Sequence, residues 1–123
     1  MFEGIAPVSR TDATMPCVPS APVTVVEFRG LQDTTVPYNG GMPLRWLWPS
    51  AKADFDQFSQ LDQCTGPVTT SHNVCQTKTM CADRTDVTLC SIHGGHVLYG
   101  AAVTDGASVP DTSWEIFQHR LSP

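Results

Sequence analysis

The order of the elements in this 123-residue sequence predicts an α/β fold built on a parallel sheet. Three short apolar runs, at residues 4–8, 23–28 and 86–92, are typical of strands, and amphipathic segments near residues 51–62 and 112–121 are typical of helices. Strands joined through helices normally pair in parallel. Three strands are few for such a sheet, which is usually continued by neighbouring strands. We therefore expect about three parallel strands, flanking helices and an incomplete sheet.

The first two predicted strands lie close together in the sequence. Residues 4–8 end at a polar Ser-Arg-Thr-Asp segment, and residues 13–22 contain three prolines, which indicates a connecting loop. Residues 23–28 have the almost continuous apolar character of a buried strand. Asp33 follows this strand just past Gly30. The sequence therefore presents a carboxylate beyond a strand end.

The two predicted helices have recognisable starts. Ser50 is a good N-cap for a helix over residues 51–62, whose phenylalanines lie on one face. Thr112 and Glu115 form a capping-box pattern at the start of the terminal helix. Between the helices, residues 64–84 have little periodicity. We expect them to form a long loop that needs a covalent constraint.

The third predicted strand is followed by a histidine. His96 comes after residues 86–92 through Gly94 and Gly95, which permit close approach of the backbone. Sites in α/β sheets form at the carboxyl ends of strands, so His96 and Asp33 are candidates for a general base and its orienting carboxylate, about 2.6 to 3.2 Å apart. The plainer alternatives are a turn aspartate that caps its own backbone and a solvated loop histidine.

Cysteine usage favours a secreted protein. Five cysteines in a chain with two lysines and ten prolines are unusual for the cytosol. We expect a disulfide between Cys64 and Cys81 across the unpatterned loop, and a free thiol at Cys90 inside a strand. Cys90, His93 and His96 have the ligand types of a zinc site but lack a Cys-x-x-Cys pair. We expect no metal and no cofactor. The five cysteines are Cys17, Cys64, Cys75, Cys81 and Cys90.

Charge and hydropathy exclude several kinds of partner. The formal net charge is −5, with no cluster of lysine or arginine, which argues against nucleic acid and anionic membranes. The first residues lack the basic region of a signal peptide, and no run of eighteen apolar residues is present to span a membrane. A neutral or weakly charged substrate suits this chain better.

Four segments together carry a resemblance to a known family. They are Ile-Ala-Pro-Val-Ser at 5–9, Val-Val-Glu-Phe-Arg-Gly-Leu-Gln-Asp-Thr-Thr-Val-Pro-Tyr-Asn-Gly-Gly at 25–41, Val-Thr-Leu-Cys-Ser-Ile-His-Gly-Gly-His at 87–96 and Trp-Glu-Ile-Phe at 114–117. In this order they resemble the C-terminal half of secreted α/β-hydrolase esterases, which include fungal feruloyl esterases and polyhydroxybutyrate depolymerase-like proteins. The resemblance implies a secreted serine carboxylesterase acting on a small ester or a plant cell-wall polysaccharide ester.

The resemblance also assigns roles to two residues. It implies that Asp33 is the acid and His96 the base of a catalytic triad, with the serine in a Gly-x-Ser-x-Gly turn upstream of both. This sequence contains no Gly-x-Ser-x-Gly. We therefore expect residues 1–123 to be a partial α/β-hydrolase domain whose nucleophile half precedes Met1, and the chain alone to be inactive.

Two alternatives and two departures accompany this interpretation. The chain could be a non-catalytic secreted remnant or binding domain on the same scaffold, and it could need the missing half or self-association to cover the sheet edge. Members of the family commonly carry a histidine where this chain has Arg29, and an aromatic residue where it has Leu98. The first departure concerns loop packing near the acid, and the second concerns the shape of the substrate pocket.

Overall fold

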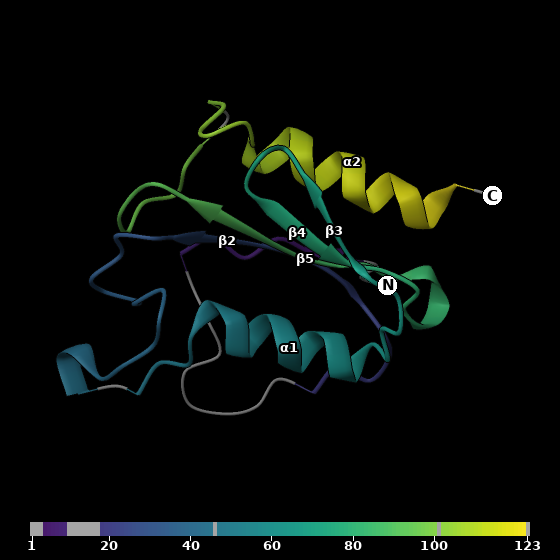
Figure 1. Cartoon of the computed structure of the whole chain (residues 1–123), viewed down its shortest axis with the longest axis horizontal. Helices are drawn as coiled ribbons and strands as arrows, with labels where there is room; N and C mark the ends of the chain where they lie inside the picture. The colour runs from purple at the N-terminus through teal and green to yellow at the C-terminus, as the bar shows by residue number, and fades with distance from the viewer. Residues whose placement is uncertain (1–3, 10–17, 46, 101, 123) are drawn as a thin grey trace.

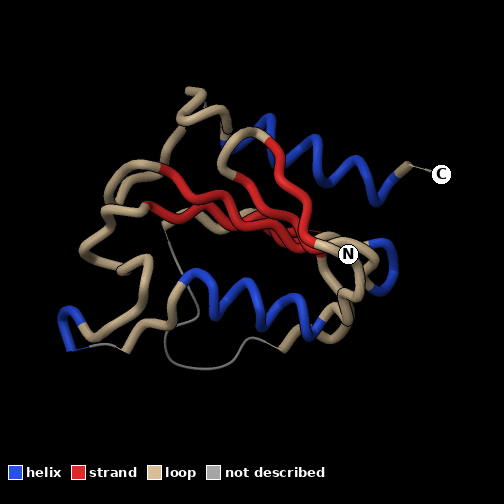
Figure 2. The backbone as a smooth tube through the Cα atoms, viewed as in Figure 1, coloured by secondary structure: helices blue, strands red, loops and turns tan. Residues whose placement is uncertain are grey.

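A central sheet lies between two helices in the computed structural model, which describes residues 4–9, 18–45, 47–100 and 102–122. The three layers are visible in Figure 1, and Figure 2 separates strands from helices by colour. The α/β class predicted from the sequence is confirmed. The strands and helices are β1 (Gly4–Ile5), β2 (Thr24–Gly30), α1 (Ala51–Leu61), β3 (Val68–Ser71), β4 (Cys75–Lys78), β5 (Val87–Ile92) and α2 (Val109–Leu121), with short 3-10 turns at Pro43–Arg45 and Ala82–Arg84.

The sheet has five strands in the order β1-β2-β5-β4-β3 within the described ranges. β1, β2 and β5 are parallel to one another, whereas β4 and β3 join β5 as an antiparallel pair. The expected parallel pairing of the second and third apolar runs is therefore confirmed. The expectation of about three strands in a wholly parallel sheet was wrong, because the sheet is mixed and extends by a hairpin.

This hairpin occupies the segment that we expected to be an unpatterned loop. All four residues of β3 are exposed and β4 is only partly buried. Neither strand shows the alternation of apolar and polar residues that marks a half-buried strand. The turn between them places His72 and Asn73 at positive φ, 51° and 62°, without the glycine that usually signals such a turn. The prediction failed because both the strand signal and the turn signal are weak here.

One disulfide joins the two segments that flank the hairpin, and the other joins β4 to β5. The predicted bridge between Cys64 and Cys81 is confirmed. The prediction that Cys90 is a free thiol was wrong, because Cys90 is bonded to Cys75. These two cysteines lie directly opposite each other in the β4–β5 pairing, and both are completely buried. Cys17 lies outside the described residues.

Helix α1 covers one face of the sheet and agrees with the prediction. It begins after the N-cap Ser50, whose hydroxyl accepts a hydrogen bond from the Ala53 amide at 3.0 Å, and it ends at Leu61. Phe55 and Phe58 are buried in a cluster with apolar side chains of β2 and β5. The burial of this aromatic face, rather than helix propensity alone, holds α1 on the sheet.

Helix α2 covers the opposite face and starts earlier than predicted. Its N-cap is Ser108, not a residue near Thr112, because Pro110 is well placed in the first helical turn, where its missing amide costs no hydrogen bond. Ile116 and Phe117 pack against a second buried cluster, which includes apolar side chains of β2 and β5 and the cysteines Cys75 and Cys90. Among the described helices, none is long and apolar enough to cross a membrane.

Candidate functional site

The two central strands end at the same edge of the sheet. β2 and β5 pair in parallel over six residue pairs, the last of which joins Gly30 to Ile92. The chain leaves both strands at this edge, and the Gln32 amide donates to the Gly94 carbonyl at 3.0 Å. Backbone hydrogen bonds therefore join the loop after β2 to the loop after β5. These bonds lie just before Asp33 in one loop and just before His96 in the other.

The structure brings Asp33 and His96 into direct contact. His96 Nδ1 lies 3.0 Å from Asp33 Oδ2, within the distance expected from the sequence. The His96 side chain is 44% exposed, whereas the Asp33 side chain is 1% exposed. Since the carboxylate accepts from Nδ1–H, the neutral ring leaves its Nε2 lone pair free, and no hydrogen bond joins Nε2 to the described part of the chain. This arrangement is suited to accepting a proton at Nε2.

The second oxygen of Asp33 holds the turn that follows β2. Asp33 Oδ1 accepts hydrogen bonds from the backbone amides of Thr35 and Val36, both at 2.8 Å. Such a contact is typical of an aspartate that caps its own turn. The alternative in which Asp33 caps its own backbone therefore also describes the structure. One carboxylate oxygen accepts from the turn amides, and the other contacts the imidazole.

These contacts keep Asp33 ionised. Burial acts to raise the pKa of Asp33, but the hydrogen bonds from the Val36 amide, His96 and the Thr35 amide together outweigh burial and lower the pKa below its usual value. The carboxylate therefore stays negative over the range in which histidine titrates. A fixed negative charge beside Nδ1 stabilises an imidazolium formed by protonation at Nε2.

The loop that carries His96 is held by residues that the sequence reasoning did not assign. The Tyr99 hydroxyl donates to the Gly95 carbonyl at 2.5 Å, and the Ser9 hydroxyl donates to the Val97 carbonyl at 2.6 Å. Burial raises the pKa of the Tyr99 phenol, and the charge of Asp33 adds to this effect. Ser9 directly follows Val8, which forms an isolated parallel bridge to Phe28 beyond the end of β1, and its place after an apolar run was its only signal in the sequence.

Gly30 is expected to be indispensable for this loop. A Cβ at Gly30 would lie 2.5 Å from the Gly94 carbonyl oxygen and 2.7 Å from the Gly95 carbonyl oxygen, and backbone atoms cannot yield as a flexible side chain would. Replacing Gly30 with alanine should therefore displace the loop and break the contact between Asp33 and His96. Long-range ¹H–¹⁵N NMR of the His96 ring would detect this as loss of a single Nδ1–H tautomer.

Gly41 supplies the control for this substitution. It has a φ of 138°, and a Cβ at this position would have no neighbouring heavy atom within 4 Å, so alanine there strains the backbone without touching the loop. The Gly41→Ala variant should keep the wild-type His96 spectrum. An unchanged spectrum in folded Gly30→Ala would contradict the prediction.

A second histidine–carboxylate pair anchors the start of the same loop. Asp105 Oδ2 accepts from the His93 backbone amide at 2.7 Å and lies 3.1 Å from His93 Nδ1. The backbone hydrogen bond is the main cause that lowers the pKa of Asp105.

The described residues contain no group of three or more histidine, cysteine, aspartate or glutamate side chains placed to hold a metal ion. Cys90, one of the three residues considered for zinc, is occupied in a disulfide.

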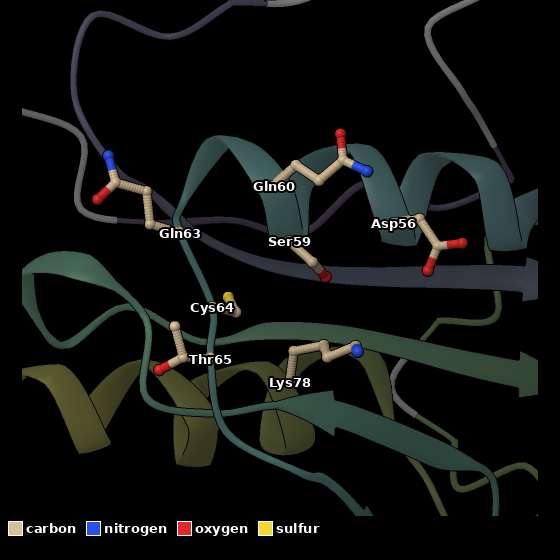
Figure 3. Close-up of a pocket in the computed structure, with 7 residues that line it drawn as sticks. All are labelled: Asp56, Ser59, Gln60, Gln63, Cys64, Thr65 and Lys78. Carbon is tan, nitrogen blue, oxygen red and sulfur yellow. The ribbon is translucent and has the colours of Figure 1, made fainter.

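Two cavities of the described structure lie away from this pair. One of about 330 Å³, shown in Figure 3, lies beside α1 and is reached by Lys78 of β4. A neighbouring cavity of about 390 Å³ shares Asp56 and Lys78 with it. Neither of these two cavities is lined by Asp33 or His96, and the candidate site is described by its hydrogen bonds. The residues around the first cavity are Asp56, Ser59, Gln60, Gln63, Cys64, Thr65 and Lys78.

Comparison with known proteins gives one informative similarity. No family model matches the sequence. The chain is 34% identical over 99 residues to feruloyl esterase B of Piromyces equi, an alignment that includes 73% of this chain and 17% of that protein. The chain thus spans less than a fifth of the esterase that it matches. At this level of similarity, the chain is a distant relative of an esterase.

Proposed function

We propose that Asp33 and His96 are the acid and the base of a serine carboxylic ester hydrolase of the α/β-hydrolase class. The observation that supports this most strongly is the 3.0 Å hydrogen bond between a buried carboxylate and a half-exposed imidazole at the carboxyl ends of two parallel strands. The similarity to a feruloyl esterase supports the same reaction class. On this proposal, residues 1–123 are part of an α/β-hydrolase domain.

The pair would act by moving a proton through His96. Nε2 takes the proton of a serine hydroxyl as the oxygen attacks the ester carbonyl, and the imidazolium then gives this proton to the departing alkoxide. A water molecule releases the acyl group in a second cycle of the same transfers. Asp33 holds the ring orientation throughout and stabilises its positive charge. Its own proton affinity is too low for it to take the proton away.

The nucleophile is proposed to come from polypeptide outside these 123 residues. The sequence has no Gly-x-Ser-x-Gly, and no serine of the described ranges forms a hydrogen bond with His96. A hydroxycinnamate or short hydroxyacid ester is the proposed substrate, in keeping with the name of the relative and with a chain of net charge −5 that gives no attraction to polyanions. The two disulfides are typical of a protein that folds in an oxidising, extracellular setting.

A second candidate function is a secreted binding domain that keeps the scaffold without turnover. The absence of a Gly-x-Ser-x-Gly turn from the sequence favours this candidate. A base and a carboxylate cannot form an acyl-enzyme without a nucleophile. The two candidates therefore differ in whether any longer polypeptide that contains this chain supplies the serine.

The chain alone is expected to show no saturable hydrolysis of p-nitrophenyl acetate or methyl ferulate, because His96 has no serine to activate. The rate should not exceed that of an Asp33→Asn, His96→Ala double variant measured in parallel. Saturable turnover that a serine-directed fluorophosphonate abolishes would show that the chain holds its own nucleophile.

The esterase proposal itself is tested on the longer polypeptide encoded in frame with this chain. It should contain a Gly-x-Ser-x-Gly and hydrolyse methyl ferulate or a short hydroxyacid ester, and Asp33→Asn should lower its kcat by roughly 10³- to 10⁴-fold with a small change in KM. A folded longer polypeptide that lacks the serine turn, or that has it and remains inactive on both ester classes, would favour the binding domain.

A further inference from the structure

Arg29 is the largest side chain that is completely buried in the described structure. It lies near the end of β2, on the α1 face of the sheet, where the apolar positions of the strand give way to charged ones. A guanidinium cannot be neutralised by losing its proton at any ordinary pH, so its burial is tolerated only where anions and acceptors surround it. Its partners therefore show what this charge does.

Two buried carboxylates hold the guanidinium in place. Arg29 Nη1 lies 2.9 Å from Glu27 Oε1 on the same strand and 3.2 Å from Asp54 Oδ2 on α1. Glu27 and Asp54 are 3% and 2% exposed. The guanidinium is thus fixed from the strand on one side and from the helix on the other, which leaves its second terminal nitrogen with a defined direction.

That second nitrogen binds the turn that orients Asp33. Arg29 Nη2 donates to the Pro37 carbonyl at 3.1 Å. Pro37 directly follows Val36, whose amide donates to Asp33 Oδ1. The arginine therefore holds the far end of the turn at the residue next to the amide that fixes the carboxylate. Arg29 Nε is buried without a hydrogen-bond partner among the described residues, so the role of the side chain rests on its two terminal nitrogens.

The charges of this cluster support a positioning role over a stabilising one. Arg29 pairs with both Glu27 and Asp54, and the charge of Asp54 acts against ionisation of Glu27. Burial raises the pKa of Glu27 to about 7, even though Arg29 acts to lower it. Replacing a buried ion pair with well-packed apolar side chains is often neutral or stabilising, and in some proteins such a pair is retained because it specifies a geometry.

We propose that Arg29 is a positioning residue for Asp33, which acts by holding the Pro37 end of the Asp33–Pro37 turn from a guanidinium clamped between Glu27 and Asp54. The relevance of this role to catalysis rests on the proposed esterase function. The positioning itself is a property of the chain and is measurable without turnover. The hydrogen bonds of Arg29 go to Glu27, Asp54 and Pro37, and none of them reaches His96.

Arg29→Lys tests the proposal while keeping the buried positive charge. A lysine has one terminal nitrogen, so it can satisfy the carboxylates but cannot also hold the Pro37 carbonyl in the same geometry. We expect the pKa of Asp33, followed by ¹³C NMR of its carboxyl group, to rise by about one unit, which is a tenfold change in proton affinity. Amide hydrogen exchange at Val36 should become at least about tenfold faster, while amides in the middle of β2 keep their rates.

Two controls separate positioning from a general loss of stability. Arg45→Lys makes the same chemical change at an exposed site and should leave Asp33 unchanged. The pKa of Asp105, which is also lowered by a backbone hydrogen bond but in another loop, should stay the same in Arg29→Lys. If Arg29→Lys does not fold, the Glu27→Gln, Arg29→Met double variant removes one charge of each sign and should give the same rise in the pKa of Asp33.

The outcome that overturns the proposal is a folded variant in which the pKa of Asp33 and exchange at Val36 are both unchanged. A rise in the pKa of Asp105 equal to that of Asp33 would also overturn it, because the effect would then be global. These results are independent of the ester assays. If the longer polypeptide is inactive, the esterase proposal fails but the positioning of Asp33 by Arg29 still holds. If Arg29→Lys leaves Asp33 unchanged, the positioning role fails even where the longer polypeptide hydrolyses esters.

Discussion

Replacing both Cys75 and Cys90 with alanine is expected to lower the free energy of unfolding by about 4 to 5 kcal/mol. Removing a bridge that closes a loop of this length costs about 3 kcal/mol through the added freedom of the unfolded chain. The remainder comes from packing, because both cysteines are completely buried in the core cluster that α2 covers, and two lost sulfur atoms leave an apolar void there. Urea unfolding followed by circular dichroism would measure the loss.

The other disulfide is a matched control for this measurement. The bridge between Cys64 and Cys81 has a sequence separation of 17, against 15 for the bridge between Cys75 and Cys90, so the two differ little in loop length. Cys64 and Cys81 are only partly buried. Alanine at both should cost about 3 kcal/mol. Equal losses for the two double variants would show that core packing around Cys75 and Cys90 adds nothing.

Glu27→Gln is expected to remove a large part of the pH dependence of stability near neutrality. The pKa of Glu27 is raised from 4.5 to about 7 by burial and by the charge of Asp54, against the opposing effect of Arg29. The folded state therefore binds this proton more tightly than the unfolded state, so the associated stability is complete below pH 4.5 and is lost as the pH rises to about 7. Each pKa unit corresponds to about 1.4 kcal/mol. Wild-type protein should thus lose about 2 kcal/mol more than the variant between about pH 5 and pH 8.

Glutamine resembles the protonated acid in shape, so the variant keeps the pair between Arg29 and Asp54. All other titratable groups are the same in both proteins and cancel in the difference. The lowered pKa of Asp33 acts in a more acidic interval and with the opposite sign, since its stability is lost as the pH falls. Parallel pH profiles for wild type and Glu27→Gln would show that Glu27 is ionised in the folded protein throughout.

The parts of the fold that could be predicted are those with strong local signals. β2 and β5 are rich in β-branched and other apolar residues, and both strands are buried in the structure. Ser50 is a cap with a standard side-chain contact, and α1 begins directly after it. If the two strands are parallel, their carboxyl ends lie at the same edge of the sheet, where α/β sheets form their sites. This predicts that Asp33 lies near His96. The geometry of the candidate site followed from these few steps.

The remaining features depend on contacts that no local pattern announces. The β3–β4 hairpin lacks both apolar alternation and a glycine turn, and without it nothing indicated that Cys75 faces Cys90. The burial of Arg29 was equally hidden, because its partners come from β2, from α1 and from the loop between them. An arginine at a strand end normally reaches solvent, so only the three-dimensional arrangement reveals its role.

The two disulfides interlace along the chain, because Cys75 lies between Cys64 and Cys81, and Cys81 lies between Cys75 and Cys90. A single proteolytic cut anywhere between the first and the last of these cysteines therefore leaves the molecule in one covalent piece. The exposed residues of β3 and the turn that follows offer a protease access to the backbone. Cleavage there would open a loop but would not release β5, so the loop that carries His96 would remain attached to its sheet.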